Sequence, residues 1–383
     1  MNSLRNILVC VSTLSLLVGC GDSSPAADAS VDRAGDASVD APAADAPAAD
    51  APAADAPAAD APAADAPAAD GSTGNGLRFL ARFNLMQGQL PEGIAIRDGY
   101  AYLGFAPTGQ VMRVDAMGNA TMYGQVPIPP SMTAMPNGYL LGLAFDRAGN
   151  LYAAAPSFSM GFMAGVYRMG PMGGMATLFA RDTMGRMNFP NGIDFDAMGN
   201  LFVTDSGSGS VFKISPDGMT VSQWVTNMLL TGIPGGNPCG PGAGFPIGAN
   251  GIVVDAMGGN VYVTNTDRAT LVRIPITMTG AAGTPTVIVA QDCQRLAGAD
   301  GLTRGPDGAL YIAANSANRI VRVGIDGMNP TVLEMSPLLD SPASIAFGPL
   351  SGASTMFITN AAFNTAQSMP AMARPGLLVR PAM

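Results

Sequence analysis

The sequence contains no histidine among its 383 residues. This absence excludes Ser-His-Asp and Cys-His catalysis, histidine general bases and histidine-bound zinc. Any chemistry must therefore use carboxylates, amides, hydroxyls, or a hard cation held by oxygen ligands.

Cysteine is also scarce, with four residues in the chain. Cys10 and Cys20 lie in the N-terminal segment, which leaves Cys239 and Cys293 for the rest. Outside the cytoplasm such a pair is typical of a disulfide, and a metal role is disfavoured because no histidine completes a site. We predict a Cys239–Cys293 disulfide.

Lysine is nearly absent: the only one is Lys213. The net charge of −9 comes from aspartates in residues 21–76, whereas acidic and basic residues balance in residues 77–383. There is no basic face, so a nucleic-acid partner is not expected.

The first twenty residues have the order of a secretory signal. Arg5 precedes an apolar run over residues 7–18, too short to span a membrane, and "LVGC" ends at Cys20. A small residue before this cysteine resembles a bacterial lipobox, which predicts lipidation of Cys20 and export to the cell envelope, with the outer membrane or cell surface favoured. The alternative is an ordinary cleaved signal with an incidental cysteine.

Residues 21–76 contain almost no large apolar side chain and include six copies of "APAAD". Such a segment cannot offset the entropy of folding, so it is predicted to be a disordered tether. The folded domain is then residues 77–383.

That domain repeats one pattern six times: a short strand, a glycine-containing turn and a second strand, usually followed by a third and a fourth. The units begin at Pro91, Leu140, Pro190, Ala249, Ala299 and Pro342. Four strands per unit predict an all-β fold, a six-bladed β-propeller of four-stranded antiparallel blades. We expect the final "PGLLVRP" to return beside "LRFLARF" and close the ring.

One position of each unit precedes the glycine or small residue that opens the inner strand. In order these residues are Glu92, Leu141, Asn191, Asn250, Asp300 and Ala343. Equivalent positions form a ring at one mouth of a propeller, and four of these six carry oxygen. Two carboxylates and two amides suit Ca²⁺, with Mg²⁺ or Mn²⁺ as substitutes. The alternative is that each doublet is a turn before a strand, where Asn and Asp are common.

The order Glu, apolar, Asn, Asn, Asp, small, with "PEG", "PNG", "ANG" and "ADG" before inner strands, resembles the gluconolactonase / regucalcin / luciferin-regenerating-enzyme-like family. The resemblance implies a six-bladed propeller with a divalent cation at its central mouth. By position it implies Glu92, Asn250 and Asp300 as metal ligands, and Asn191 as a ligand to metal or substrate. The absence of histidine favours a lactonase over a phosphotriesterase.

These expectations predict a monomeric, metal-dependent hydrolase of a lactone or related ester, with a small-molecule substrate and membrane contact only through its anchor. Asp300 would be the catalytic base or orient water. Asp205, Asn265 and Asn315, each placed at the end of a second strand, are candidate substrate-binding residues together with Asn191; the alternative for them is capping of strand ends. The competing class is a non-catalytic propeller that binds a small ligand, glycan or envelope protein.

Methionine is abundant, with 25 residues, and "DAMG" recurs from Asp115, Asp196 and Asp255. We interpret these segments as hairpin turns whose methionine covers the neighbouring blade. The alternative is a methionine-rich or soft-metal-binding surface.

Overall fold

The computed structural model describes residues 76–132, 136–235, 237–240, 244–255 and 259–382. The predicted signal sequence, the lipidated Cys20 and the predicted tether of residues 21–76, except Gly76, lie outside these ranges and stay predictions. None of the helices within them has the length and apolarity needed to cross a bilayer.

The described chain is almost entirely β-structure, in four four-stranded sheets and one eight-stranded sheet. Three of the four-stranded sheets follow the chain order. These are β10 to β13 (Pro190–Phe195, Leu201–Asp205, Ser210–Ile214, Val221–Thr226), β14 to β17 (Ala249–Val254, Asn260–Asn265, Thr270–Pro275, Thr286–Val289) and β18 to β21 (Ala299–Arg304, Leu310–Ala314, Arg319–Val323, Thr331–Glu334).

The eight-stranded sheet consists of two antiparallel halves. They are β2 to β5 (Pro91–Arg97, Tyr100–Phe105, Gln110–Val114, Ala120–Gln125) and β6 to β9 (Leu143–Phe145, Leu151–Ala155, Gly165–Gly170, Gly173–Ala180). The halves meet through a short parallel pairing of β5 with β9, Gly124 opposite Gly174 and Gln125 opposite Met175. The inner strand β6 is shorter than expected from the sequence, although the Leu141 amide still donates to the Ala154 carbonyl.

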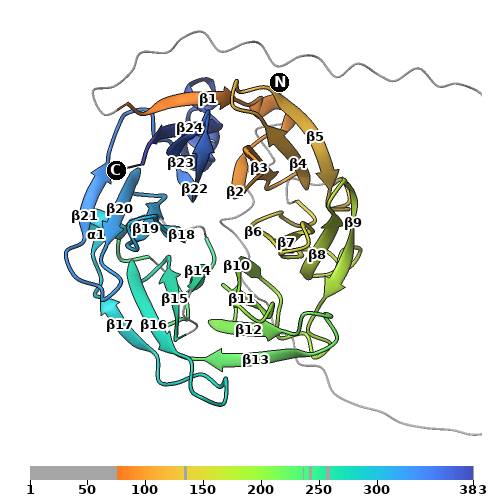
Figure 1. Ribbon diagram of the computed structural model, residues 1–383, viewed down its shortest axis with the longest axis vertical. Coiled ribbons are helices and arrows are strands. Elements are labelled where there is room, and N and C mark those ends of the chain that lie inside the picture. The colour runs from red at the N-terminus through yellow and green to blue at the C-terminus, as the bar shows by residue number, and fades with distance from the viewer. Residues whose placement is uncertain (1–75, 133–135, 236, 241–243, 256–258, 383) are drawn as a thin grey trace, which may run out of the picture. The chain divides into compact units, whose positions relative to one another are not determined.

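The last sheet joins the two ends of the described chain. Its order is β1 (Arg78–Arg82), β24 (Gly376–Pro381), β23 (Ala353–Asn360) and β22 (Pro342–Leu350), with β1 antiparallel to β24. This pairing confirms the predicted return of the C-terminal strand to the start of the domain. The sheets follow one another around a central axis, as Figure 1 shows.

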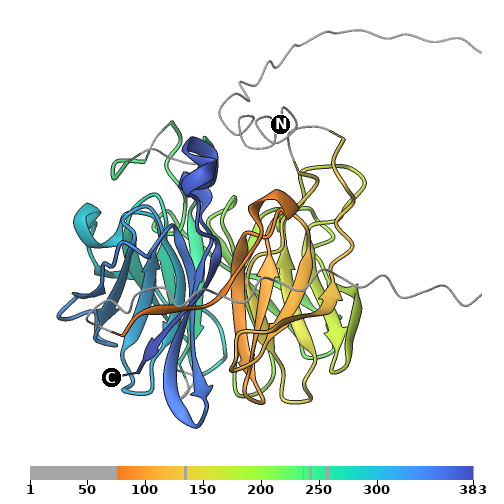
Figure 2. The ribbon, with the colours of Figure 1, turned by 90° about the horizontal axis from the view of Figure 1, so that it is seen from above.

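The two ends of the strands differ in their connections. Figure 2 shows the helix α2 (Phe363–Ser368) and the longer connections at one end and tight hairpins, including that of β22 and β23, at the other. The remaining helices are short: η2 (Leu85–Gln87), α1 (Cys293–Leu296) and η3 (Pro370–Met372). We call the two ends the loop end and the hairpin end; the inner strands begin at the loop end.

The hydrophobic core lies between neighbouring sheets. Phe212 and Ile214 of β12, for example, pack with Tyr152 of β7 and Val166 of β8, and all four are buried. Burial of one such aromatic or aliphatic side chain contributes about 1.5–3 kcal/mol. Stacked sheets with apolar faces therefore hold the ring together and fix where each inner strand begins.

The hairpin turns differ from one expectation. Met117 and Met198 of the two described "DAMGN" segments are 82% and 74% exposed, so they do not cover a neighbouring sheet. The third segment, from Asp255, has its methionine outside the described residues.

Candidate functional site

The Asn191-Gly192 doublet lies inside β10 and not in a turn before it. The register of β10 with β11 shifts between Pro190 and Ile193, which places a bulge at this doublet. The same shift recurs at Pro91/Ile94, Ala249/Ile252, Ala299/Leu302 and Pro342/Ile345. The turn interpretation of these doublets is therefore wrong, and a repeated bulge sets the direction of each side chain.

The glycine of each doublet is required by close approach of the next inner strand. A Cβ atom on Gly192 would lie 2.4 Å from the carbonyl oxygen of Asn250, and one on Gly251 would lie 2.4 Å from that of Asp300. Real Cβ atoms essentially never come within 3.0 Å of such an atom. The glycine thus lets the backbone of one unit reach the ring residue of the next.

These contacts link the six predicted positions in order. The Cβ positions of Gly93, Gly142 and Gly301 fall 2.1, 2.5 and 2.4 Å from the carbonyl oxygens of Leu141, Asn191 and Ala343. The Thr359 hydroxyl, beside Ala343 in the last sheet, donates to the Glu92 carbonyl at 2.7 Å. Glu92, Leu141, Asn191, Asn250, Asp300 and Ala343 therefore form a closed ring, which we call the mouth ring.

All four polar residues of the mouth ring are buried: Glu92, Asn191, Asn250 and Asp300 are 4, 5, 5 and 8% exposed. The Glu92 Oε2 atom is buried without a hydrogen-bond partner in the described chain. A buried carboxylate oxygen without a donor is costly, because it has lost water and gained nothing in exchange.

The two carboxyls influence each other. Burial raises the pKa of Glu92 well above its usual value, and the nearby Asp300 carboxylate raises it further. Burial raises the pKa of Asp300 to about 7, partly opposed by the amides of Asn315 and Asn250. No lysine or arginine of the described chain contributes to either pKa shift. The mouth ring thus brings two acidic side chains together with no basic side chain of the described residues to favour their ionised forms.

Each of the two asparagines donates from its side-chain amide to a hydroxyl group of its own unit. Asn191 Nδ2 donates to the Ser206 hydroxyl at 3.0 Å, and Asn250 Nδ2 donates to the Thr266 hydroxyl at 2.9 Å. Asn315 Nδ2 donates to Asp300 Oδ2 at 3.3 Å, so each of these three ring residues has a polar partner from its own unit.

The backbone shows that these partners are equivalent. The amides of Ser206, Thr266 and Asn315 each donate to the carbonyl just before the inner strand, on Phe189, Gly248 and Gly298. Asn315 thus matches Ser206 and Thr266, whereas Ala314 is the counterpart of Asp205 and Asn265 in the strand register. The sequence-based alignment of Asn315 with Asp205 and Asn265 was one residue out of register.

Asp205 and Asn265 do not line a substrate pocket. Both are fully buried. Asp205 accepts hydrogen bonds from the amides of Asn188, Phe189 and Ser208, and Asn265 donates to the carbonyls of Leu229 and Thr231 and accepts from the Arg268 amide. These contacts correct the predicted substrate-binding role, since capping of strand ends occupies both side chains.

Three threonines that sequence reasoning passed over connect the ring. Thr204 and Thr264 donate to the carbonyls of Asn250 and Asp300, as Thr359 does to Glu92. In the sequence each precedes Asp or Asn, in "VTD", "VTN" and "ITN". This recurring threonine is the sequence pattern that could have predicted the contacts between neighbouring units.

The Cys239–Cys293 disulfide is present, as predicted. It joins the connection after β13 to α1, which leads into β18 and Asp300. Asp267, between β15 and β16, accepts with its carboxylate from the amides of Ile233 and Ile247 on the same connection, both at 2.9 Å. The segment beside the mouth ring is therefore attached at several points.

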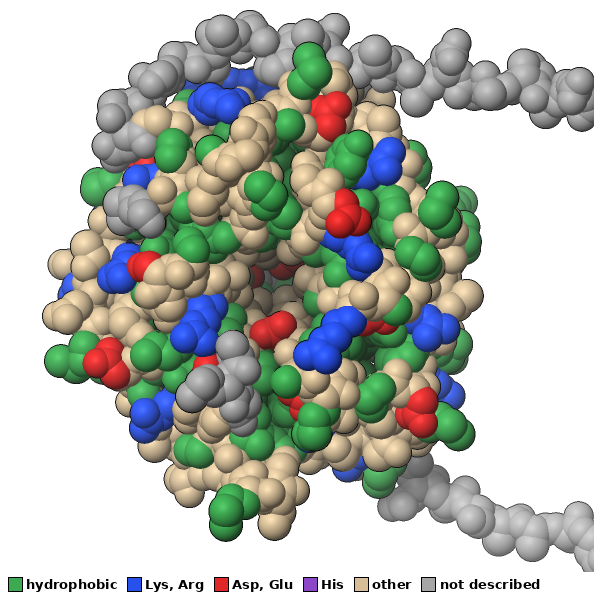
Figure 3. All heavy atoms as spheres, in the orientation of Figure 1, with side chains coloured by type: hydrophobic (Ala, Val, Ile, Leu, Met, Phe, Trp, Pro, Cys, Tyr) green, Lys and Arg blue, Asp and Glu red, His purple; other side chains and the backbone are tan. Residues whose placement is uncertain are grey.

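Two cavities, of about 300 and 270 Å³, lie away from the mouth ring. The first contains Asp182, which is paired with Arg186 at 2.7 Å, and the second contains turn residues such as Asp146 and Asp196. Neither includes a ring residue. Figure 3 shows a hollow at the centre of one face with acidic side chains visible inside it.

The fold and the mouth ring define the class: a propeller-like ring of antiparallel sheets with an oxygen-lined central mouth. Residues 246–362 match the model of the SMP-30/Gluconolactonase/LRE-like region. This match includes Asn250 and Asp300, and over this part of the chain it agrees with the family resemblance expected from the sequence. A search of the curated proteins gives no match.

Solved structures show the same fold at low identity. Regucalcin, a calcium-binding protein from Agrobacterium tumefaciens, is 17% identical, with 77% of this chain and 90% of that chain covered and a TM-score of 0.56. A structure whose title names a gluconolactonase is 16% identical, with 80% of this chain and 91% of that chain covered and a TM-score of 0.56. The PQQ-bound aldose sugar dehydrogenase of Streptomyces coelicolor is 16% identical over 79% and 97%, with a TM-score of 0.51. One fold thus serves different chemistries.

Proposed function

We propose that the domain is a six-bladed propeller, in which each half of the eight-stranded sheet is one blade, and that its mouth ring binds a divalent cation. Glu92, Asn191, Asn250 and Asp300 would hold the cation, which the donor chemistry suggests is Ca²⁺. We further propose that the bound form hydrolyses a lactone or related carboxylic ester.

The observation that carries the proposal is the buried Glu92–Asp300 pair. These two carboxyls repel each other, one of their oxygens has no hydrogen-bond partner, and no lysine or arginine of the described residues shifts their pKa, so a cation fits as the missing partner. In the described residues, no three His, Cys, Asp or Glu side chains lie together so that they could hold a metal ion. The amide oxygens of Asn191 and Asn250 would therefore complete the oxygen set, which suits Ca²⁺ better than Zn²⁺.

The likeness to regucalcin and to the gluconolactonase structure supports this reading at the level of the fold. The names of those proteins mention calcium binding and a lactonase activity. The match of residues 246–362 to the same family includes two of the four proposed ligands.

A bound divalent cation would polarise the substrate carbonyl and favour the developing oxyanion. The chain's own contribution is to place Asp300 beside that carbonyl. Asn315 holds one Asp300 oxygen, and the other can orient or deprotonate a water molecule. Asn191 is positioned by Ser206 to bind the cation or a substrate oxygen.

Hydrolysis of a panel of lactones and esters, with and without added Ca²⁺, Mg²⁺ or Mn²⁺, tests the activity. Asp300→Asn is expected to lower kcat by at least about 100-fold on the best substrate, because a catalytic base is lost. Asp115→Asn, at a hairpin, is the matched control and should keep full activity. A wild-type protein that binds the cation but turns over no member of the panel would favour the non-catalytic binder instead.

We also propose that the domain is displayed on the cell envelope through a lipid on Cys20. The support is the apolar segment that ends in "LVGC", followed by residues 21–76, which contain almost no large apolar side chain. Labelling of growing cells with a clickable fatty acid should mark the wild-type chain and not Cys20→Ser. Equal labelling of both chains would contradict the anchor.

A further inference from the structure

Methionine dominates the exposed large hydrophobic residues of the described chain. Seventeen methionines are exposed, whereas Met169, Met187 and Met356 are buried. The exposed ones are Met86, Met117, Met122, Met132, Met160, Met163, Met172, Met175, Met184, Met198, Met219, Met228, Met278, Met328, Met335, Met369 and Met372. Methionine thioethers therefore make up nearly all of the large apolar side chains that solvent reaches in the described chain.

Four of the exposed methionines occupy the same place in a hairpin. In each, the methionine amide donates to the Oδ1 of an aspartate two residues earlier, at 2.8 to 3.0 Å. The pairs are Asp115–Met117, Asp196–Met198, Asp217–Met219 and Asp326–Met328. Their side chains are 82, 74, 85 and 60% exposed. We call these four residues the turn methionines.

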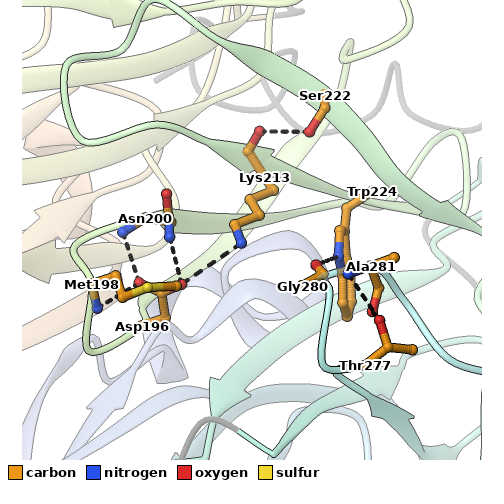
Figure 4. A network of polar contacts seen from close by, with 9 residues as sticks. All are labelled: Asp196, Met198, Asn200, Lys213, Ser222, Trp224, Thr277, Gly280 and Ala281. Atoms are coloured by element: carbon orange, nitrogen blue, oxygen red, sulfur yellow. Dashed lines mark hydrogen bonds and ion pairs between the residues drawn. The ribbon is translucent and has the colours of Figure 1, made fainter.

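Figure 4 shows how one of these turns is built. The Asp196 carboxylate accepts from the amides of Met198 and Asn200 and from Asn200 Nδ2, and it lies 3.9 Å from Lys213 Nζ. Each of these contacts joins the aspartate to a backbone amide, to the Asn200 side chain or to the Lys213 side chain. The methionine thioether takes part in none of them.

Another hairpin shows that the turn does not need methionine. In Asp146-Arg147-Ala148-Gly149-Asn150, the aspartate accepts from the Asn150 amide at 2.8 Å and from Asn150 Nδ2 at 2.7 Å. This hairpin shares both asparagine contacts of the Asp196 turn and contains no thioether. The sulfur atoms at the other tips are thus free to change chemically without altering the turn.

The mouth ring, in contrast, contains no thioether and no thiol, which are the side-chain groups that two-electron oxidants attack most readily. Its polar members are carboxylates and amides, and the nearby Cys239 and Cys293 already form a disulfide. The three buried methionines lie in or beside strands of the core, where a polar sulfoxide would disrupt packing. Oxidation of exposed sulfur would spare both the site and the core.

We propose that the exposed methionines are an oxidant-consuming surface for strong two-electron oxidants such as hypochlorous acid. Each thioether sulfur gains one oxygen and loses two electrons to the chlorine, which leaves as chloride with one proton. The products are methionine sulfoxide and hydrochloric acid, so the step balances without another reactant. The sulfoxide at a hairpin tip breaks no packing contact, and this role is independent of the function of the mouth ring.

The test is a titration of the purified full-length chain with hypochlorous acid, followed by peptide mass mapping and thermal unfolding. The turn methionines should reach half-oxidation at roughly ten times fewer equivalents than Met169, Met187 and Met356, because thioether oxidation follows exposure. The melting temperature should stay within about 2 °C until the exposed sulfurs are consumed. Parallel oxidation of exposed and buried methionines would overturn the proposal.

A quadruple variant separates protection from mere reactivity. With Met117, Met198, Met219 and Met328 all changed to leucine, unfolding should begin about four equivalents earlier, since each thioether takes one oxygen. The control Met169→Leu removes a buried sulfur and should leave the onset unchanged. An onset that is the same in the quadruple variant and the wild type would contradict the proposal.

Discussion

The two ends of the strands use the same residue types in opposite ways. At the hairpin end, Asp115 accepts two amides and the Asn119 side chain, and the Asn119 hydrogen bond is the main cause that lowers the pKa of Asp115. At the loop end, burial raises the pKa of Asp300 to about 7, and no described residue donates to the Glu92 Oε2 atom. A hairpin aspartate completes its own turn, whereas no lysine or arginine of the described chain shifts the pKa of the mouth-ring carboxyls.

The difference arises from the backbone. In a hairpin turn, a short acidic side chain can accept hydrogen bonds from backbone amides up to four residues later. The mouth ring lies at strand bulges, where the neighbouring inner strand takes up the adjacent space and the side chain is directed inward. Two aspartates thus have different roles because one lies in a hairpin turn and the other at a strand bulge.

The largest expected effect tests the close approach of inner strands. Gly192→Ala puts a Cβ atom 2.4 Å from the Asn250 carbonyl oxygen, and it should lower the free energy of unfolding by about 3 kcal/mol. Gly170→Ala is the control, because no atom lies within 4 Å of its added Cβ. Urea denaturation of both variants measures the difference in the free energy of unfolding. Equally small decreases in the two variants would contradict the close approach of the inner strands.

The next prediction concerns pH. Burial raises the pKa of Asp194 to about 6, partly opposed by the amides of Val254 and Phe195. The folded pKa exceeds the unfolded value, so this group is more protonated in the folded state, and its effect on stability becomes less favourable as pH rises from about 4 to 6. Asp194→Asn removes that loss, so its stability relative to wild type should improve by up to about 3 kcal/mol between pH 4 and pH 7.

The hairpin end should respond with the opposite sign. The pKa of Asp115 is lowered, so this carboxylate stabilises the protein above its unfolded pKa and loses that contribution as pH falls. Asp115→Asn should therefore lose stability relative to wild type as pH rises. Denaturation at both pH values compares the variants, and the same sign for both would contradict the distinction.

The smallest effect tests the partners of the ring residues. Asn315→Ala removes the amide that holds Asp300 Oδ2, and Ca²⁺ affinity should fall about tenfold, as for other residues that orient a metal ligand. Asn200→Ala removes a comparable amide at a hairpin and should leave the affinity unchanged. Isothermal titration of both variants decides whether the partner matters.

Much of the architecture was predictable because the repeat is periodic. The strands and the ring of Glu92, Asn191, Asn250 and Asp300 follow from unit-by-unit alignment. The return of β24 to β1 follows from the expected closure of such a ring, and the disulfide follows from the two cysteines outside the N-terminal segment. The bulges were not predictable, because an Asn-Gly doublet is as typical of a turn as of a bulge. Asn315 was placed one residue out of register because the short strand β19 ends in alanines that give no boundary.

The burial of individual polar side chains was also hidden from the sequence. Asp205 and Asn265 resemble pocket residues until the amides around them are located in three dimensions. Conversely, Ser206 and Thr266 carry no pattern that marks them, because their importance depends on which ring amide they face.

Calorimetric titration of the full-length protein with Ca²⁺, in wild type and Glu92→Gln, tests the central claim most directly. Glu92→Gln keeps the size of the side chain and removes one of two negative charges at the mouth ring. The account predicts one Ca²⁺ per chain in the wild type and an affinity at least about 100-fold weaker in the variant. Equal affinity in the two proteins, or no binding to the wild type, would contradict it.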